Sequence, residues 1–569
     1  MRTRLAALLA AAGALALPAA ASAHAVLLRT VPQASVVVNT PPAELRLTYS
    51  EAVEPRFAVV SVTDAAARQE TAGPPRRSAA DPNTLVVPLD RVREGWYLVY
   101  WRAISADGHP VRGAFTFAVG PNPGPAPQFV IPSTSETAAT PRLLAARWLT
   151  FLSIMSAVGL AVLRLATARP VARRVPDASL RGVTAAFAVA AAVGLAAAPV
   201  YLLLATADFA LRSWWRVGAL VPLVRVSAFG RGMFDLWVAF ALFAAAAAFA
   251  IRIDRPERER RSVAELVAAA GAAAAAAAVL LVPGLAGHAA QTSPRGLSLV
   301  LDWAHLAAGS VWVGGLLGLL VLWRSAPPAS RVACLAATVP RFSNAALVSV
   351  LVLIGSGTGA AVIHLPTLAS LWQTSYGRAL LWKIGLLAAA LVLAAANLLR
   401  TRGRLRRPAT GERAAVALRR LVAGEGLLVA AAVFAAAVLS SLPPPSKALA
   451  ALAGASAHVG PGRIARTVEK GGYTFAVEVA PNRAAMPNSF AVHVTHDGKP
   501  VRGAEVVLTF AMLDMEMGRQ AYRLTETSPG TYAAAKPALV MVGHWSLSFD
   551  VTPPGGRQVT VLLVDTARG

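Results

Sequence analysis

The chain has 569 residues, of which 56% are hydrophobic and 15% are charged, and its 54 Lys and Arg against 29 Asp and Glu give a formal net charge of +25. So high an apolar content excludes an ordinary soluble protein, and basic residues grouped between long apolar runs favour a membrane protein over one that binds nucleic acid. The single cysteine, Cys334, excludes a disulfide-stapled domain and any cysteine-based zinc or iron–sulfur site.

Residues 1–23 have the form of a signal peptide, with a basic start, an apolar run and a small-residue cleavage site that ends at Ala23. Cleavage there makes His24 the mature N-terminus. Its α-amine and its imidazole, with ordinary pKa values of about 7.7–8 and about 6.5, can both be deprotonated near neutral pH. Together they would chelate a metal such as Cu(II). The alternative is that His24 is merely the residue that follows the cleavage site.

Residues 24–120 alternate apolar and polar side chains and are interrupted by Pro and Gly, which predicts an all-β sandwich. The following segment, residues 121–141, is rich in Pro, Ser, Thr and Gly and reads as a linker. The predicted strands of the sandwich are Glu44–Tyr49, Phe57–Thr63, Thr84–Leu89, Trp96–Ile104 and Ala114–Val119.

Residues 142–442 contain eight apolar runs of membrane-spanning length, which predicts a polytopic α-helical bundle of about eight helices. The fourth run is rich in Ala and therefore only weakly hydrophobic. The segment 208–232 has the composition of an interfacial segment. The eight predicted spans lie near residues 143–165, 182–206, 233–251, 263–284, 297–323, 343–365, 379–399 and 421–442.

The basic residues give an orientation for these spans. The signal peptide places residues 24–120 outside the cell, and eight spans return the C-terminus to the same side. The loops then assigned to the inside carry most of the arginines, as the positive-inside rule requires, although the outer segment 208–232 also has four. The sequence therefore predicts a multi-pass plasma (inner) membrane protein with both terminal domains extracytoplasmic and with Cys334 in an inner loop.

Beyond the last span, residues 443–464 form a second linker and residues 465–569 a second all-β sandwich. Its strands are predicted at Tyr473–Val479, Phe490–Val494, Glu505–Phe510, Tyr532–Ala535, Trp545–Val551 and Val559–Val564.

The segment Ser105–Val111 contains Asp107 and His109 around an Asp-Gly turn between two predicted strands. An acid and an imidazole two residues apart can reach one ion, whereas in a plain surface turn Asp107 would cap backbone amides. With His24, these residues form a nitrogen-rich set suited to Cu(II).

Several stretches of residues 24–120 match a known family, namely His24-Ala25, Pro32, Tyr49-Ser50-Glu51 and Trp101–Gly113. On these residues the region resembles CopC, the periplasmic copper-binding sandwich with an Ig-like or cupredoxin-like fold. The resemblance implies that Cu(II) is held by the amine and imidazole of His24, by His109 and by Asp107. Many CopC proteins also have a Met-rich Cu(I) loop, but residues 64–83 contain neither Met nor His.

The membrane region has three further matching stretches, Ala286–Ala289, Asp302–Leu316 and Tyr376–Lys383. On these it resembles CopD, the membrane protein to which CopC is often fused, over roughly residues 285–400. The resemblance implies copper transport or copper homeostasis.

Four polar side chains of the predicted bundle are candidates for a membrane metal site. Asp302 and His305 are three residues apart and share a helix face in the outer part of the fifth span. His288 lies in the preceding outer loop, and His364 ends the sixth span on the outer side. Ionisable residues within spans are functional candidates. Alternatively, these groups bond only to lipid headgroups or water.

Two Gly-x-x-x-Gly patterns, starting at Gly314 and Gly355, predict close packing of the fifth span on the sixth, which would bring His305 near His364. Three further charged residues lie within predicted spans, and we expect them to anchor span ends by reaching toward the interface. They are Asp235, Lys383 and Glu425.

In the C-terminal domain, Met512, Met515, Met517 and His544 are candidates for a Cu(I) site, because thioethers suit Cu(I). The alternative is that Met fills the core. The stretches Met512–Met517 and Gly530–Trp545 resemble the YtkA-like domain that accompanies copper proteins.

Together these features predict a non-enzymatic protein that binds copper, as Cu(II) and also Cu(I), and moves it across the plasma membrane, with uptake favoured by the outer capture domain. Its expected partners are copper ions, the lipid bilayer and a periplasmic copper chaperone. Three alternatives stay open: copper sequestration without transport, a haem-bearing electron-transfer bundle, and copper oxygenase chemistry at the N-terminal histidine.

Overall fold

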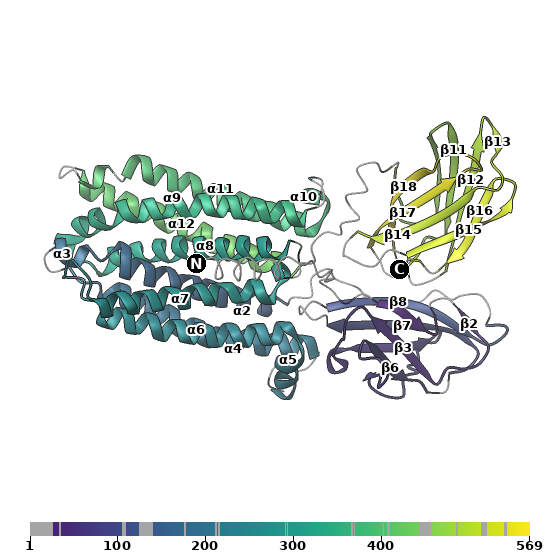
Figure 1. Ribbon diagram of the computed structural model, residues 1–569, viewed down its shortest axis with the longest axis horizontal. Coiled ribbons are helices and arrows are strands. Elements are labelled where there is room, and N and C mark those ends of the chain that lie inside the picture. The colour runs from purple at the N-terminus through teal and green to yellow at the C-terminus, as the bar shows by residue number, and fades with distance from the viewer. Residues whose placement is uncertain are drawn as a thin grey trace, which may run out of the picture. The chain divides into compact units, whose positions relative to one another are not determined.

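The computed structural model describes a helical domain and two β domains, one before it and one after it in the chain (Figure 1). The described residues are 25–568 without 26, 34–35, 91, 105–109, 124–139, 176–177, 211–212, 214, 216, 291, 293, 366–367, 369, 402, 407–409, 443–454, 456, 485–486, 514–519, 537 and 540–542. The signal-peptide prediction for residues 1–23 lies outside them.

The N-terminal domain is a sandwich of two four-stranded sheets, with strand orders β1-β3-β6-β5 and β2-β8-β7-β4. All five predicted strands are present, although β8 begins four residues earlier than expected. The strands are β1 (Leu27–Val31), β2 (Val37–Val38), β3 (Glu44–Tyr49), β4 (Val59–Asp64), β5 (Arg76–Arg77), β6 (Thr84–Pro88), β7 (Gly95–Ile104) and β8 (Pro110–Val119).

The core of this sandwich follows from the alternation in its sequence. In β3, Leu45 and Leu47 are buried, whereas Arg46 between them is exposed. The rings of Tyr97 and Phe117 stack with their centroids 5.3 Å apart. The longer strands therefore contribute one apolar face each to a shared core.

The described residues of the helical domain include eight helices long and apolar enough to span a membrane, which confirms the predicted number. The Ala-rich fourth span is among them as α7. The eight helices are α2 (Pro141–Val162), α4 (Arg181–Ala210), α6 (Ala228–Ile253), α7 (Val263–Ala286), α8 (Arg295–Ser325), α9 (Arg331–His364), α11 (Ser375–Ala396) and α12 (Gly411–Leu439).

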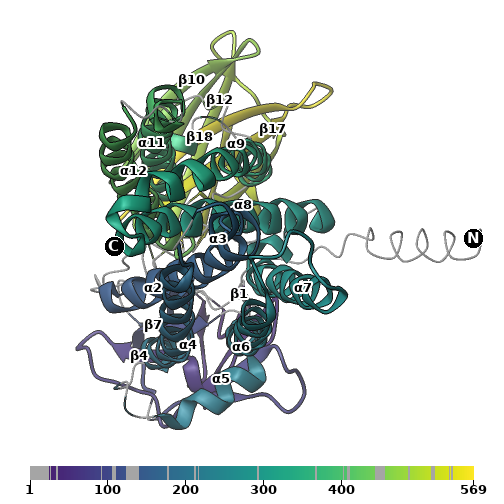
Figure 2. The ribbon, with the colours of Figure 1, turned by 90° about the vertical axis from the view of Figure 1, so that its left-hand side faces the viewer.

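Helices α2 and α8 are the most buried of the eight spans, and the view along the helices shows α8 between α9 and the group of α2, α4 and α6 (Figure 2). In their most apolar 18-residue stretches, 67% and 61% of the residues are buried inside the protein. The two backbones approach so closely that a Cβ on Gly159 of α2 would lie 2.0 Å from the carbonyl oxygen of Ser310 of α8. Only glycine fits at this crossing.

The two glycine patterns differ in their partners. Gly314 packs against Gly159 of α2, so the first pattern joins the fifth span to the first rather than to the sixth. Helices α8 and α9 pack together as predicted, through Gly359 of the second pattern against Leu301 and also through Gly315 against Phe342. Spacing of small residues marks a face for close packing without identifying the neighbour.

Two helices extend further than hydropathy indicates. Helix α9 begins at Arg331 rather than near residue 343, and α12 begins at Gly411 rather than near residue 421. Consequently Cys334 lies in the first turn of α9, where it is fully buried, and not in a loop. Polar residues can continue a helix beyond the hydrocarbon region, which hydropathy does not detect.

An ion-pair cluster joins three helices at one end of the bundle. Asp254, at the end of α6, forms ion pairs with Arg164, Arg169 and Arg261 at N–O distances of 3.0, 3.3 and 3.1 Å. The carboxylate side chain is 2% exposed. Next to the cluster, Ser262 and Glu265 form a capping box at the start of α7.

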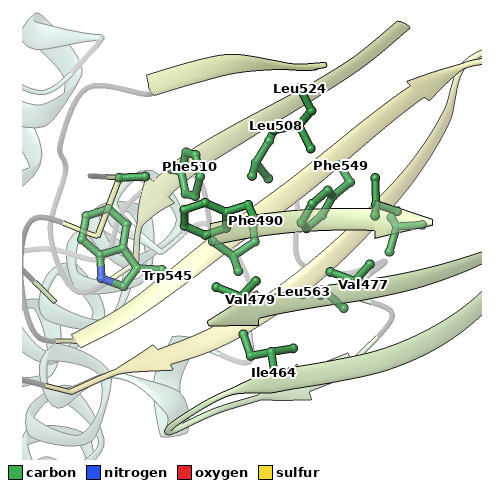
Figure 3. Packing of buried hydrophobic residues seen from close by; sticks show 14 of the residues in the cluster. Ile464, Val477, Val479, Phe490, Leu508, Phe510, Leu524, Trp545, Phe549 and Leu563 are labelled. Carbon is green, nitrogen blue, oxygen red and sulfur yellow. The ribbon is translucent and has the colours of Figure 1, made fainter. Parts of the chain in front are cut away.

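The C-terminal domain is a β structure in which strands follow the order β10-β11-β12-β16-β15-β14-β17-β18-β9, with β13 beside β12. The pairs are antiparallel except for β18 and β9, which are parallel. Aromatic residues from both halves of the path meet in one core (Figure 3), where the rings of Phe490 and Phe510 lie 4.9 Å apart. All six predicted strands are present. The strands are β9 (Ala457–Val459), β10 (Ile464–Lys470), β11 (Tyr473–Ala480), β12 (Asn488–His496), β13 (Lys499–Pro500), β14 (Glu505–Met512), β15 (Gln520–Ser528), β16 (Thr531–Lys536), β17 (Gly543–Thr552) and β18 (Val559–Ala567).

Candidate functional site

His305 of α8 is held by a serine on the neighbouring helix. Its Nδ1 lies 3.0 Å from Oγ of Ser356 on α9, and that hydroxyl donates to the carbonyl oxygen of Val352 at 2.6 Å. Because the hydroxyl hydrogen is already used, Ser356 Oγ accepts from the Nδ1–H of the imidazole. Hydrogen-bond logic thus assigns the Nδ1-protonated tautomer, which leaves a lone pair on Nε2.

The Nε2 atom of His305 faces a lysine. Nζ of Lys383 on α11 lies 3.4 Å from it. On the other side of the ring, Gly357 leaves space, since a Cβ there would come within 3.3 Å of Cε1 of His305. The expectation that Lys383 only anchors the end of a span is therefore wrong, because its amine is directed at a side chain of the bundle.

Asp302 lies one helical turn before His305. Its Oδ2 occupies space left open by Gly284 of α7, where a Cβ would lie 2.8 Å away. The carboxylate is also close enough to Lys383 for an electrostatic interaction. Lys383, which was predicted to anchor a span end, thus lies beside the predicted pair of Asp302 and His305.

The other two predicted members of the membrane site are placed differently. His364 ends α9, where its Nδ1 lies 2.8 Å from the carbonyl oxygen of Ala360 and its Nε2 3.4 Å from Oγ1 of Thr292. It is eight residues beyond Ser356, about 12 Å along the helix from the level of His305. The side chain of His288 lies outside the described part of the chain.

Among the described residues, no group of three or more His, Cys, Asp or Glu side chains is arranged to hold a metal ion. The membrane site of His288, Asp302, His305 and His364 therefore stays a prediction, of which the structure brings together Asp302 and His305.

A second polar pair lies in the middle of the bundle. Nε1 of Trp312 on α8 donates to Oε1 of Glu425 on α12 at 2.7 Å, and both side chains are almost fully buried. Glu425 is 14 residues from either end of α12. The prediction that it anchors a span end is wrong, because it relied on a helix that starts ten residues too late.

The predicted Cu(II) ligands of the N-terminal domain, His24, Asp107 and His109, lie outside the described residues. Their surroundings are described. Ala25 is buried in the sandwich core, and Leu27 of β1 pairs with Tyr49 of β3.

The ring of Tyr49 packs edge-on against that of Trp101 on β7, with the centroids 5.6 Å apart. Trp101 in turn lies opposite Gly113 of β8, where a Cβ would collide with the indole at 2.8 Å. The start of the folded domain and the β7–β8 hairpin are therefore joined through one aromatic contact.

The predicted Cu(I) residues of the C-terminal domain are described only in part. Met512 is buried in the hydrophobic core, while His544 is exposed on β17. The amide of Leu513 donates to the carbonyl oxygen of His544 at 2.8 Å, so the backbone brings these two segments together. Met515 and Met517 lie outside the described residues, and this site stays a prediction.

A buried carboxylate in the C-terminal domain was not anticipated from the sequence. Oδ1 of Asp565 accepts from Nδ2 of Asn482 at 2.8 Å, while Oδ2 of Asp565 and Oδ1 of Asn482 have no hydrogen-bond partner among the described residues. Burial raises the pKa of Asp565 to about 6. Its position in an apolar strand gives no sequence signal that would have singled it out.

Three family models match the chain. They are the CopC domain over residues 27–120, copper resistance protein D over residues 336–439 and the YtkA-like domain over residues 467–550. The copper resistance protein D match contains one of the three stretches that resemble CopD, Tyr376–Lys383. The other two, Ala286–Ala289 and Asp302–Leu316, precede the matched residues.

Relatives cover both the whole chain and its first domain. Copper transport protein CutJ of Bacillus subtilis is 26% identical over 564 residues, which is 97% of each chain. Copper resistance protein C of Escherichia coli is 34% identical over 106 residues, 17% of this chain and 83% of that protein. The crystal structure of CopC from Methylosinus trichosporium OB3b is 27% identical, covers 18% of this chain and 99% of that one, and has a TM-score of 0.17.

Proposed function

Because the chain belongs to the copper resistance family, with CopC, CopD and YtkA-like domains in this order, we propose that it captures copper outside the plasma membrane and carries it inward through the helical bundle. The family and the eight spans make the chain a multi-pass membrane protein of copper transport or resistance. Uptake, rather than export, is our proposal.

The observation that carries the transport role is the state of His305. A neutral imidazole that is fixed through Nδ1–H and presents Nε2 is the form in which histidine binds metals. Here Ser356 fixes the ring inside a membrane-spanning helix, and Asp302 adds a negative charge one turn away. Burying ionisable side chains inside a membrane span costs a few kcal/mol of free energy unless they are paired or line a water-filled path. A path for a copper ion would explain why they are there.

Capture would take place in the N-terminal domain, where the amine and imidazole of His24, His109 and Asp107 form a Cu(II) site. Two observations support this site. Ala25, next to His24, is buried in the sandwich, and the Tyr49–Trp101 contact joins the start of the domain to the β7–β8 hairpin that carries Asp107 and His109. In the C-terminal domain, Met512, Met515, Met517 and His544 would receive Cu(I), with a periplasmic copper chaperone as the donor. All these sites require both β domains to be extracytoplasmic.

The transport proposal is tested by copper accumulation in cells, expressed per molecule of protein in the membrane. We expect His305→Ala to abolish uptake while Cu(II) binding by the N-terminal domain persists. The matched control is His493→Ala in the C-terminal domain, because His493 also hydrogen-bonds a hydroxyl, Oγ1 of Thr531 at 2.9 Å. Wild-type uptake per molecule in His305→Ala would refute the membrane site.

The direction of transport is tested by comparing the copper content of cells with and without the protein. Higher cellular copper with the wild-type protein supports uptake. Lower cellular copper indicates export. Unchanged cellular copper together with copper bound at the cell surface indicates sequestration, which is the second candidate function.

The capture site is tested by Cu(II) titration with electron paramagnetic resonance. We expect one tetragonal, nitrogen-rich Cu(II) per protein. A glycine inserted before His24 should weaken binding by orders of magnitude, because it separates the amine from the imidazole, and His109→Ala should do the same. Unchanged affinity in both variants would rule out this site.

A further inference from the structure

Helix α11 is attached to the rest of the bundle more loosely than any central helix, yet it directs an amine into it. Only 6% of the residues in its most apolar stretch are buried inside the protein. Leu381, Trp382 and Ile384, which flank Lys383, are 42%, 74% and 49% exposed. Against this lipid-facing background, Lys383 is directed toward His305.

The depth of Lys383 within its helix argues against a simple anchor. It lies eight residues from the start of α11, and His305 and Ser356 lie ten and eight residues from the corresponding ends of α8 and α9. All three are therefore about 12–15 Å inside the bundle. A lysine that only reached for headgroups would extend its flexible stem toward the helix end, whereas here Nζ lies 3.4 Å from Nε2 of His305.

The Lys383 amine occupies the position that a metal on His305 would need. The Nδ1 side of the ring is held by Ser356, so Nε2 is the nitrogen with a lone pair to offer. An ammonium is a compact cation with three donors. It lies against this lone pair and interacts electrostatically with the Asp302 carboxylate.

We propose that Lys383 is a tethered cation that fills the copper position at His305 and Asp302 until the ion displaces it. This inference rests on the proposed transport function and adds a competitor to its membrane site. On displacement, the hydrogen bond from Nζ to Nε2 breaks and the same lone pair binds the metal. The amine moves away on its four-carbon stem, and no proton or electron is transferred.

This arrangement would balance the negative charge of Asp302 inside the bundle when copper is absent. It would also set a threshold, because only an ion that binds imidazole nitrogen more strongly than the ammonium does could enter. Hard monovalent cations such as Na⁺ or K⁺ prefer oxygen ligands and would not displace it. Lys383 would thus contribute specificity as well as charge balance.

The test is Cu(I) affinity of the full-length protein in detergent, measured anaerobically by competition with a coloured Cu(I) chelator. The His305-dependent part is obtained by repeating each titration with His305→Ala added. We expect Lys383→Leu to increase the His305-dependent affinity by about tenfold to a hundredfold, the value of one hydrogen bond to a charged group. Lys383→Arg keeps the cation, so it should stay much closer to wild type.

Each outcome of this test decides between the two proposals. Unchanged or weaker His305-dependent binding in Lys383→Leu overturns the tethered-cation proposal while leaving the copper site intact. Absence of any His305-dependent binding in either background overturns the membrane site itself, and the tethered cation with it. If Lys383→Leu does not accumulate in the membrane, Lys383→Gln, which is also neutral, is read in the same way.

Discussion

The α2–α8 pair and α11 belong to one bundle but are packed in opposite ways. The pair is joined by glycines whose backbones touch and is mostly buried, whereas only 6% of the residues in the most apolar stretch of α11 are buried and Lys383 is directed inward. A rigid centre can hold His305 on α8 in a fixed position, while a loosely packed helix can change position at low cost. Under the proposed function, α8 would fix the geometry of the copper site and α11 would carry the competing cation.

The largest expected effect comes from filling the glycine crossing. Gly159→Leu would place side-chain atoms inside the backbone of α8, so we expect loss of folded protein from the membrane. The matched control is Gly385→Leu on α11, where nothing lies within 4 Å of the added Cβ. Comparable abundance of the two variants in membrane fractions would remove the contrast between the two regions.

The next largest effect concerns the arginine cluster that ties α6 to the centre. Asp254→Ala leaves three arginines without their shared carboxylate, one of them 8% exposed, and should cost about 3–5 kcal/mol of unfolding free energy. The control is Glu257→Ala, an exposed acid three residues away. Thermal stability in detergent measures both, and equal losses would show that the cluster has no special role.

How much of this could be predicted from the sequence depends on the kind of information needed. Eight spans and eleven strands follow from hydropathy and alternation, because those patterns record burial directly. The partners of Gly314, the central position of Glu425 and the direction of Lys383 do not follow. Each requires knowledge of which helix lies next to which, or of where a helix continues through polar residues.

The metal sites divide in the same way. Asp302 and His305 were found because they are neighbours on one helix. Their relation to Lys383, 78 residues further along the chain from His305, depends on where α11 lies in the folded bundle.

A pH experiment on the C-terminal domain distinguishes unfolding of this domain from unfolding of the helical bundle. Burial raises the pKa of Asp565 to about 6 from 3.8, so the folded domain binds more protons than the unfolded chain between these values. Its stability is therefore full below about pH 4 and falls by about 3 kcal/mol as pH rises through 6.

Asp565→Asn should be more stable than wild type at pH 7 and should lack this pH dependence. Hydrogen exchange in β17 and β18, followed by mass spectrometry, reports the change, while exchange in α2 and α8 should stay constant. A wild-type pH profile in Asp565→Asn would assign the dependence to another group.

The smallest effect is expected at the pair in the middle of the bundle. Glu425→Ala leaves Nε1–H of the buried Trp312 without its acceptor and should cost about 1–3 kcal/mol. Glu425→Gln keeps an acceptor oxygen and should cost less. Stability in detergent measures both variants. If Gln is as damaging as Ala, the negative charge rather than the hydrogen bond matters at this position.

The burial of Cys334 has a practical consequence. Because the only thiol of the chain is enclosed in the first turn of α9, water-soluble labelling reagents should leave the native protein unmodified. A cysteine introduced at the outward-facing Trp382 would then carry a spin label or fluorophore alone. Displacement of α11 during copper binding can therefore be followed spectroscopically without first removing the native cysteine.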